Sequence, residues 1–201
     1  MIKYNKSKVI FLKEKYADGE GAFIYPDRSK YEGHWKDGQR DGFGIHTLRD
    51  GSSYCGQQKN GHRHGKGTEI FKNGEKYSGN WFYGVREGKG IYKWPSGSKY
   101  VGDFKYGRRH GLGTYIFSFG KKYIGEWKRG MLHGQGVEIS KDGEIKYIGQ
   151  WNHFNKDEGI AIDKSGRMLR KEPKASRTMQ VSVRDHRGKI THSERMHTRS
   201  I

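Results

Sequence analysis

The stretch YSGNWFYGVREGKGIYKWPSGSK, residues 77–99, is followed directly by YVGDFKYGRRHGLGTYIFSFGKK, residues 100–122. Each begins with tyrosine, has glycine two residues on and an aromatic residue four on, and has further glycines seven, eleven, thirteen and twenty on. Tyrosines spaced by 23 residues open five such copies, at Tyr31, Tyr54, Tyr77, Tyr100 and Tyr123. A fixed period of this length predicts an array of stacked supersecondary units.

Each unit is predicted to be a β-hairpin. Tyr31, Gly33 and Trp35 alternate with polar residues, so they share one face of a strand. The glycines of residues 38–44 predict the turn, because glycine adopts positive φ at little cost. Two strands per unit advance the sheet by about 10 Å. The sequence therefore predicts an all-β fold: an elongated single-layer antiparallel sheet of stacked hairpins of about 23 residues each.

The repeats divide the chain into a central array and two flanks. The array runs over residues 8–166 and ends in degenerate copies that we interpret as caps. A basic N-terminal extension, 1–7, precedes it and a basic C-terminal tail, 167–201, follows. For the tail we keep two alternatives: a segment disordered until bound, or a short hairpin around 185–188. The units of the array are 8–30 (cap), 31–53, 54–76, 77–99, 100–122, 123–146 and 147–166 (cap).

Composition fits a thin array in a reducing compartment. Only 31% of the 201 residues are hydrophobic and 31 are glycine, so aromatic rings, 13% of the chain, must provide the packing. The single cysteine, Cys55, excludes an intramolecular disulfide framework. No apolar run approaches the roughly 20 residues of a membrane helix. We expect a cytoplasmic protein.

The net charge of +18 is concentrated in the flanks. Residues 1–15 contain five lysines and one acid, and residues 167–201 contain ten lysines and arginines and three acids. Such tails predict an acidic partner: a protein surface, anionic lipid or nucleic acid.

The pattern Y-x-G-x-W/F-x-x-G-x-x-x-G-x-G, as in YEGHWKDGQRDGFG and YIGEWKRGMLHGQG, resembles the MORN repeat over residues 8–166. The resemblance implies a ribbon whose groove holds a peptide or helix of a partner. A small chain made almost entirely of such repeats is most similar to the ciliary members, such as radial-spoke head proteins. It implies a non-catalytic scaffold of the cytoskeleton, most of all of the ciliary or flagellar axoneme. The alternative is a peripheral membrane tether that binds anionic phospholipid.

Two sets of side chains are candidate binding residues. A single-layer sheet has no second layer to cover its aromatic face, so we predict that part of this face contacts a partner or the chain's own tail. The other interpretation is that the rings form the core. The aromatic set is Tyr31, Trp35, Tyr54, Tyr77, Trp81, Tyr100, Phe104, Tyr123, Trp127, Tyr147 and Trp151. The second set is a basic edge of loop residues: Arg40, Arg63, Arg86, Arg108 and Arg109.

Gln58 is the exception in the aromatic row, and it predicts a local gap there. No cofactor is expected, and His62, His64, His110 and His133 are interpreted as repeat positions rather than metal ligands. Catalysis is not expected either, because the Gly-x-Gly pairs close hairpins instead of opening helices. Nucleic acid is a weak candidate partner, since no recognised nucleic-acid motif accompanies the charge.

Overall fold

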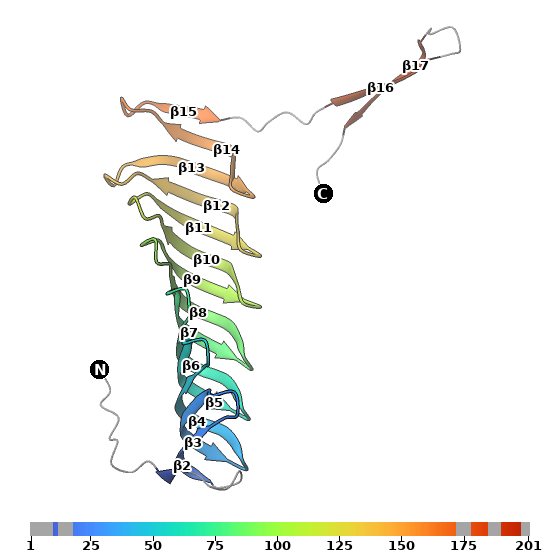
Figure 1. Cartoon of the computed structure of the whole chain (residues 1–201). Coiled ribbons are helices and arrows are strands. Elements are labelled where there is room, and N and C mark those ends of the chain that lie inside the picture. The colour runs from blue at the N-terminus through green and yellow to red at the C-terminus, as the bar shows by residue number, and fades with distance from the viewer. Residues whose placement is uncertain (1–9, 12–17, 172–177, 185–189, 198–201) are drawn as a thin grey trace.

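The computed structural model describes residues 10–11, 18–171, 178–184 and 190–197, and these form strands and turns (Figure 1). The strands are β1 Ile10–Phe11, β2 Gly19–Ile24, β3 Lys30–Lys36, β4 Gln39–Thr47, β5 Ser53–Lys59, β6 His62–Ile70, β7 Lys76–Phe82, β8 Val85–Lys93, β9 Lys99–Lys105, β10 Arg108–Ile116, β11 Lys122–Lys128, β12 Met131–Ile139, β13 Ile145–Asn152, β14 Asn155–Ile162, β15 Met168–Lys171, β16 Thr178–Arg184 and β17 Ile190–His197.

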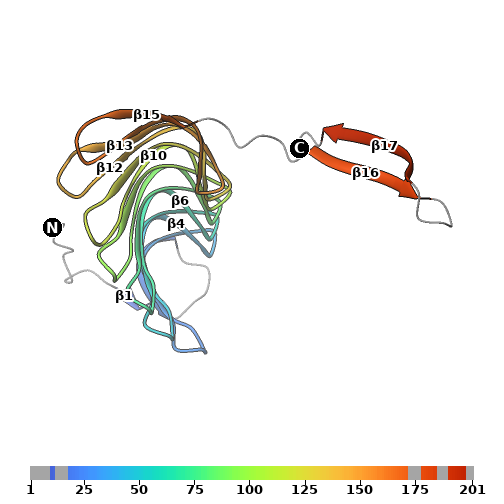
Figure 2. The same ribbon diagram turned by 90° about the horizontal axis from the view of Figure 1, so that it is seen from above.

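Strands β1 to β15 form one sheet in which every strand lies beside its neighbour in the chain. All pairings from β2 to β15 are antiparallel, and only the two-residue β1 pairs in parallel with β2. The predicted ribbon of stacked hairpins is therefore confirmed. Seen along the ribbon, the strands are bent, so the sheet is curved in cross-section (Figure 2).

The turns of the hairpins are shorter than the sequence predicted. A two-residue turn such as Asp37–Gly38, with φ of 50° and 72°, joins β3 to β4. Both residues have positive φ, which suits the right-handed twist of the two strands. Gly42 and Gly44 lie in the return strand β4 instead, where the register shifts by a bulge. The prediction that residues 38–44 form one turn was wrong.

One glycine per strand forms a continuous column across the sheet. Gly102 lies opposite Gly90 on one side and Gly113 on the other, and this pairing continues from β2 to β14. A Cβ atom on Gly102 would lie 2.5 Å from the Cα of Gly113 and 2.6 Å from the carbonyl oxygen of Leu112. The ring of Tyr100 lies over Gly113 in the same way. Glycine is therefore required at these positions, because the neighbouring backbone and the tyrosine ring leave no room for a Cβ atom.

Beyond the predicted end of the array at residue 166, the sheet continues through β15. Further on, β16 and β17 pair as a separate antiparallel hairpin, with Met179 opposite Met196. The structure thus has the hairpin that the sequence offered as one alternative for the tail. The predicted extension 1–7 lies outside the described residues.

Candidate partner-binding groove

The predicted aromatic rows form the core of the sheet. The six repeat tyrosines are at most 1% exposed. The other members of the set are at most 9% exposed: Trp35, Trp81, Phe104, Trp127 and Trp151. The prediction of an exposed aromatic face was therefore wrong, and the alternative that the rings form the core is the one observed. Burial in one layer is achieved because each ring lies on the glycine column and between rings of adjacent repeats.

Rings of successive repeats contact one another edge to face. The ring centre of Tyr100 lies 5.2 Å from that of Phe104 and 5.1 Å from that of Trp127 in the next repeat, with interplanar angles of 87° and 77°. Edge-to-face contacts of this kind add to the stabilisation from burial alone. Each buried tyrosine hydroxyl also donates to the carbonyl oxygen three residues on, as from Tyr54 to Gln57 at 2.7 Å. From the second full repeat onward, the aromatic row thus links each hairpin to the next.

The predicted basic edge covers these rings instead of facing solvent. The guanidinium of Arg109 lies 4.3 Å from the ring centre of Trp127 and 5.9 Å from that of Tyr100, and it donates to the carbonyl oxygen of Gly130 at 2.7 Å. Burial lowers the pKa of Arg109 below its usual range. Arg40, Arg63 and Arg86 lie over tyrosines in the same manner, whereas Arg108 is exposed. Four of the five arginines of the predicted basic edge therefore lie over aromatic rings, and Arg108 is the exposed one.

Gln58, which replaces the aromatic residue in the second full repeat, is 4% exposed, and its Nε2 has no hydrogen-bond partner among the described residues. It lines a cavity of about 240 Å³ together with Arg40, Arg63 and His46. The guanidinium of Arg40 donates to Nδ1 of His46 at 2.8 Å. Burial and the charge of Arg40 lower the pKa of His46 to about 4, so this ring accepts the bond as a neutral imidazole. The predicted gap is therefore present as a small pocket beside Gln58.

We expect Gln58→Trp to raise the free energy of unfolding by about 1–2 kcal/mol, because it fills a cavity and removes an unpaired amide. The indoles of Trp35, Trp81 and Trp127 donate to a glycine carbonyl fourteen residues earlier, at 3.2–3.3 Å. The equivalent acceptor for position 58 is Gly44. Urea denaturation followed by tyrosine and tryptophan fluorescence measures the change, with Gln58→Leu as a control that fills space without the hydrogen bond. A Gln58→Trp chain less stable than wild type would contradict this account.

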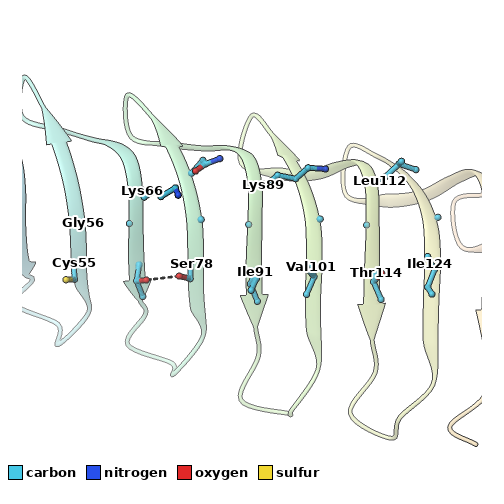
Figure 3. A pocket seen from close by; sticks show the side chains of 18 of the residues that line it. Cys55, Gly56, Lys66, Ser78, Lys89, Ile91, Val101, Leu112, Thr114 and Ile124 are labelled. Carbon is cyan, nitrogen blue, oxygen red and sulfur yellow. Dashed lines mark hydrogen bonds between the residues drawn. The ribbon is translucent and has the colours of Figure 1, made fainter. Parts of the chain in front are cut away.

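A groove lies on the face of the sheet opposite the tyrosine rings (Figure 3). It has a volume of about 1050 Å³, and its floor follows the glycine column from Gly56 to Gly125. Next to the glycines lies one row of side chains, one from each strand, and each member is opposite the next in the strand register. Between β5 and β14 this floor row is Cys55, Thr68, Ser78, Ile91, Val101, Thr114, Ile124, Val137, Ile148 and Ile160.

The floor row changes from polar to aliphatic along the ribbon. At its beginning, the hydroxyls of Thr68 and Ser78 share a hydrogen bond of 2.8 Å, drawn in Figure 3. From Ile91 onward most members are β-branched aliphatic residues, and Val101 and Ile124 keep 38% and 43% of their surface exposed. The alternation in the sequence predicted a polar face here, and these aliphatic residues were not among the predicted site residues. The signal was present, because an aliphatic residue directly follows Tyr100, Tyr123 and Tyr147.

Two rows of side chains flank the floor. Along one rim, polar side chains close the bulges: the carboxylate of Asp103 accepts from the backbone N–H of Leu112 at 3.1 Å and pairs with Lys89 at 2.7 Å. Along the other rim lie Lys76, Lys93, Lys99 and Lys122, two residues before or after a member of the floor row and therefore on the same face.

In the part of the chain that the structure describes, no three metal-ligating side chains converge, and none of the elements is an apolar helix of membrane-spanning length. Ring contacts place His64 against Phe82 and Tyr83. Cys55 is exposed in the groove, and partial burial raises the pKa of its thiol.

Comparisons with known proteins place the repeats in a family. The family model for the MORN repeat matches residues 31–53, 54–76, 77–99, 100–118 and 123–145, which is more than half of the chain. A comparison with curated proteins found no match. Among solved structures, the TCP domain of SAS-4 (dCPAP) from Drosophila melanogaster, in complex with a proline-rich motif of Ana2, is 14% identical. It matches with a TM-score of 0.48, over 85% of this chain and 95% of that one.

The TCP10 domain of Danio rerio CPAP, in complex with a STIL peptide, is 12% identical, with a TM-score of 0.30 over 86% of this chain and 92% of that one. The period, the tyrosine–glycine register and the matched ranges agree with one another. The chain belongs to the MORN repeat family.

Proposed function

We propose that the protein is a non-catalytic scaffold that holds a segment of a partner protein in the groove. The observation that supports this most is the aliphatic part of the floor row, where Ile91, Val101 and Ile124 stay 37–43% exposed, with Thr114 between Val101 and Ile124. A row of exposed apolar side chains of this kind is typical of an interaction site. The glycine column adds to it, because it lets a partner approach the backbone closely.

We further propose that the scaffold belongs to a cytoskeletal assembly, the axoneme of a cilium or flagellum such as its radial spokes. This proposal starts from membership of the MORN repeat family and from the expectation, drawn from the sequence, that a chain built mainly of such repeats resembles the family's ciliary members. It predicts that a fluorescently tagged full chain accumulates along the axoneme of ciliated cells. A diffuse cytoplasmic distribution would contradict the axonemal proposal. It would not affect the proposal that the groove binds a partner, which is tested separately.

We expect a photo-activatable cross-linker attached to Cys55 to capture a segment of the partner, because Cys55 is the chain's one cysteine and lies on the floor of the groove. The full chain is labelled, incubated with an extract of ciliated cells and irradiated, and the cross-linked peptide is identified by mass spectrometry. The same peptide must be lost when Ile91, Val101 and Ile124 are replaced by serine. Capture that is unchanged in this variant would contradict binding in the groove.

A membrane tether is the second candidate, and the tips of two neighbouring hairpins favour it. Phe82 and Tyr83 are 57% and 43% exposed, and Tyr106 is 78% exposed beside Lys105 and Arg108. Exposed aromatic and basic side chains together suit the interface of an anionic membrane. Co-sedimentation with phosphatidylserine vesicles, lost in a Phe82→Ser/Tyr106→Ser variant, would support this function. Equal sedimentation of the two chains would contradict it.

A further inference from the structure

The pocket beside Gln58 lies where one aromatic ring of the core is missing. In a later repeat the residue at this place, Phe104, has its ring centre 5.0 Å from that of Tyr77 and 5.2 Å from that of Tyr100. Gln58 replaces such a ring with a smaller side chain. The pocket of about 240 Å³ that remains is lined by the ring of Tyr54 among others, so it offers aromatic surface to a ligand.

The same replacement exposes a guanidinium to the pocket. Arg109, nine residues after its repeat tyrosine, lies 4.3 Å from the ring centre of Trp127 in the next repeat. Arg40 has the equivalent place in the first full repeat, and the ring it would cover is the one that Gln58 replaces. Arg40 therefore lines the pocket instead of covering an indole.

The pocket has one positive charge that no carboxylate balances. Arg63 pairs with the buried carboxylate of Glu69. Among the described residues, no carboxylate forms an ion pair with Arg40. Its terminal nitrogens donate to Nδ1 of His46 at 2.8 Å and to the carbonyl oxygen of Gly61 at 2.6 Å. A guanidinium has five N–H donors, so others remain for a ligand.

Gln58 provides a second unused donor. Its side chain is 4% exposed, and its Nε2 has no hydrogen-bond partner in the described part of the chain. A buried donor without a partner costs free energy, which an acceptor on a ligand would recover. Carboxylate oxygens accept strong hydrogen bonds from guanidinium groups. The donors of Gln58 and Arg40 thus suit a carboxylate, and the ring of Tyr54 suits a flat apolar group beside it.

We propose that the pocket beside Gln58 binds a small aromatic carboxylate. Its ring takes the place of the missing core ring next to Tyr54, and its carboxylate accepts hydrogen bonds from Gln58 and Arg40. A single negative charge matches the one unbalanced guanidinium. The volume is below the roughly 300 Å³ at which pockets for drug-sized ligands begin, so the ligand has one ring. This pocket lies on the tyrosine face, opposite the groove, so the inference is independent of the proposed function.

The test uses the full chain, with benzoate as the probe. Proton NMR of the histidine rings measures both affinity and location, because His46 and His62 line the pocket while His110 and His133 belong to other repeats. We expect the first two rings to shift with a dissociation constant of about 1 mM and the other two to stay unchanged. Benzamide has the ring without the charge, and acetate has the charge without the ring. We expect each to bind at least about tenfold more weakly.

Two variants and a matched control test the residues. Gln58→Trp fills the pocket and is expected to be at least as stable as wild type, so its loss of binding, at least about tenfold, does not report unfolding. Arg40→Gln is expected to weaken binding about tenfold. Arg86→Gln removes the same charge at the equivalent position two repeats later, where the guanidinium covers the rings of Tyr77 and Tyr92. We expect this control to change binding less than about twofold.

Several results would overturn the inference. Undiminished binding of benzoate to Gln58→Trp would place the ligand elsewhere. Equal losses in Arg40→Gln and Arg86→Gln, or equal affinities for acetate and benzoate, would mean general attraction of anions to a basic chain. An unchanged His46 ring at about ten times the expected dissociation constant would show that the pocket does not bind benzoate.

Discussion

Gly102→Ala is expected to lower the free energy of unfolding by about 3 kcal/mol. The added Cβ atom would lie 2.5–2.6 Å from the Cα of Gly113, the carbonyl oxygen of Leu112 and the hydroxyl of Tyr100. Two of these three atoms belong to the backbone of the paired strand β10, so no side-chain rotation relieves the contact. The strands must separate, and the tyrosine must leave its place over the glycine column.

Urea denaturation, followed by circular dichroism and by intrinsic fluorescence, measures this change. Gly97→Asn is the matched control, because a Cβ atom added at Gly97 would meet no atom within 4 Å, and its φ is +89°, a region that asparagine tolerates. We expect that control to change the stability by less than about 1 kcal/mol. If Gly102→Ala is as mild as the control, the close packing of the glycine column is not a determinant of the fold.

Trp127→Ala is expected to lower the free energy of unfolding by about 3–5 kcal/mol, in the range of large-to-small substitutions in protein cores. The indole is 3% exposed, lies 5.1 Å and 5.4 Å from the rings of Tyr100 and Tyr123, and donates from Nε1 to the carbonyl oxygen of Gly113 at 3.2 Å. It also carries the guanidinium of Arg109 on its face. The substitution thus removes contacts to two repeats at once.

Trp127→Phe is the control, because Phe104 occupies the equivalent place one repeat earlier and packs between tyrosines in the same way. We expect Trp127→Phe to lower the free energy of unfolding by less than half as much as Trp127→Ala does. A stable Trp127→Ala chain with unchanged denaturation would contradict the placement of this ring in the core. Loss of partner binding in ring-truncated chains also reports unfolding, so binding is better tested by substitutions in the floor row of the groove.

The position of the groove was not predictable from the repeat pattern alone. The alternation in Tyr-x-Gly-x-Trp correctly separates two faces, with Tyr100 and Phe104 on one and Val101 and Asp103 on the other. Which face is buried depends on how closely the aromatic rings can pack against the backbone of the sheet. The glycine column lets each tyrosine lie flat over the neighbouring strand, and arginines such as Arg109 cover the remaining ring surface. The aromatic face is thereby sealed by its own side chains.

The sequence by itself determined the all-β ribbon, its period of 23 residues and the two-strand unit, because the spacing of tyrosine and glycine is a local property that hydrogen-bonded strands repeat. Tertiary structure alone decided that arginines cover the rings, that the open groove lies on the opposite face, and that lysines such as Lys76, Lys93 and Lys99 lie opposite one another in register. These features depend on pairings between residues that are 6 to 18 positions apart and belong to different strands. A linear pattern records the residue types at such positions but not the curvature of the sheet that brings them together.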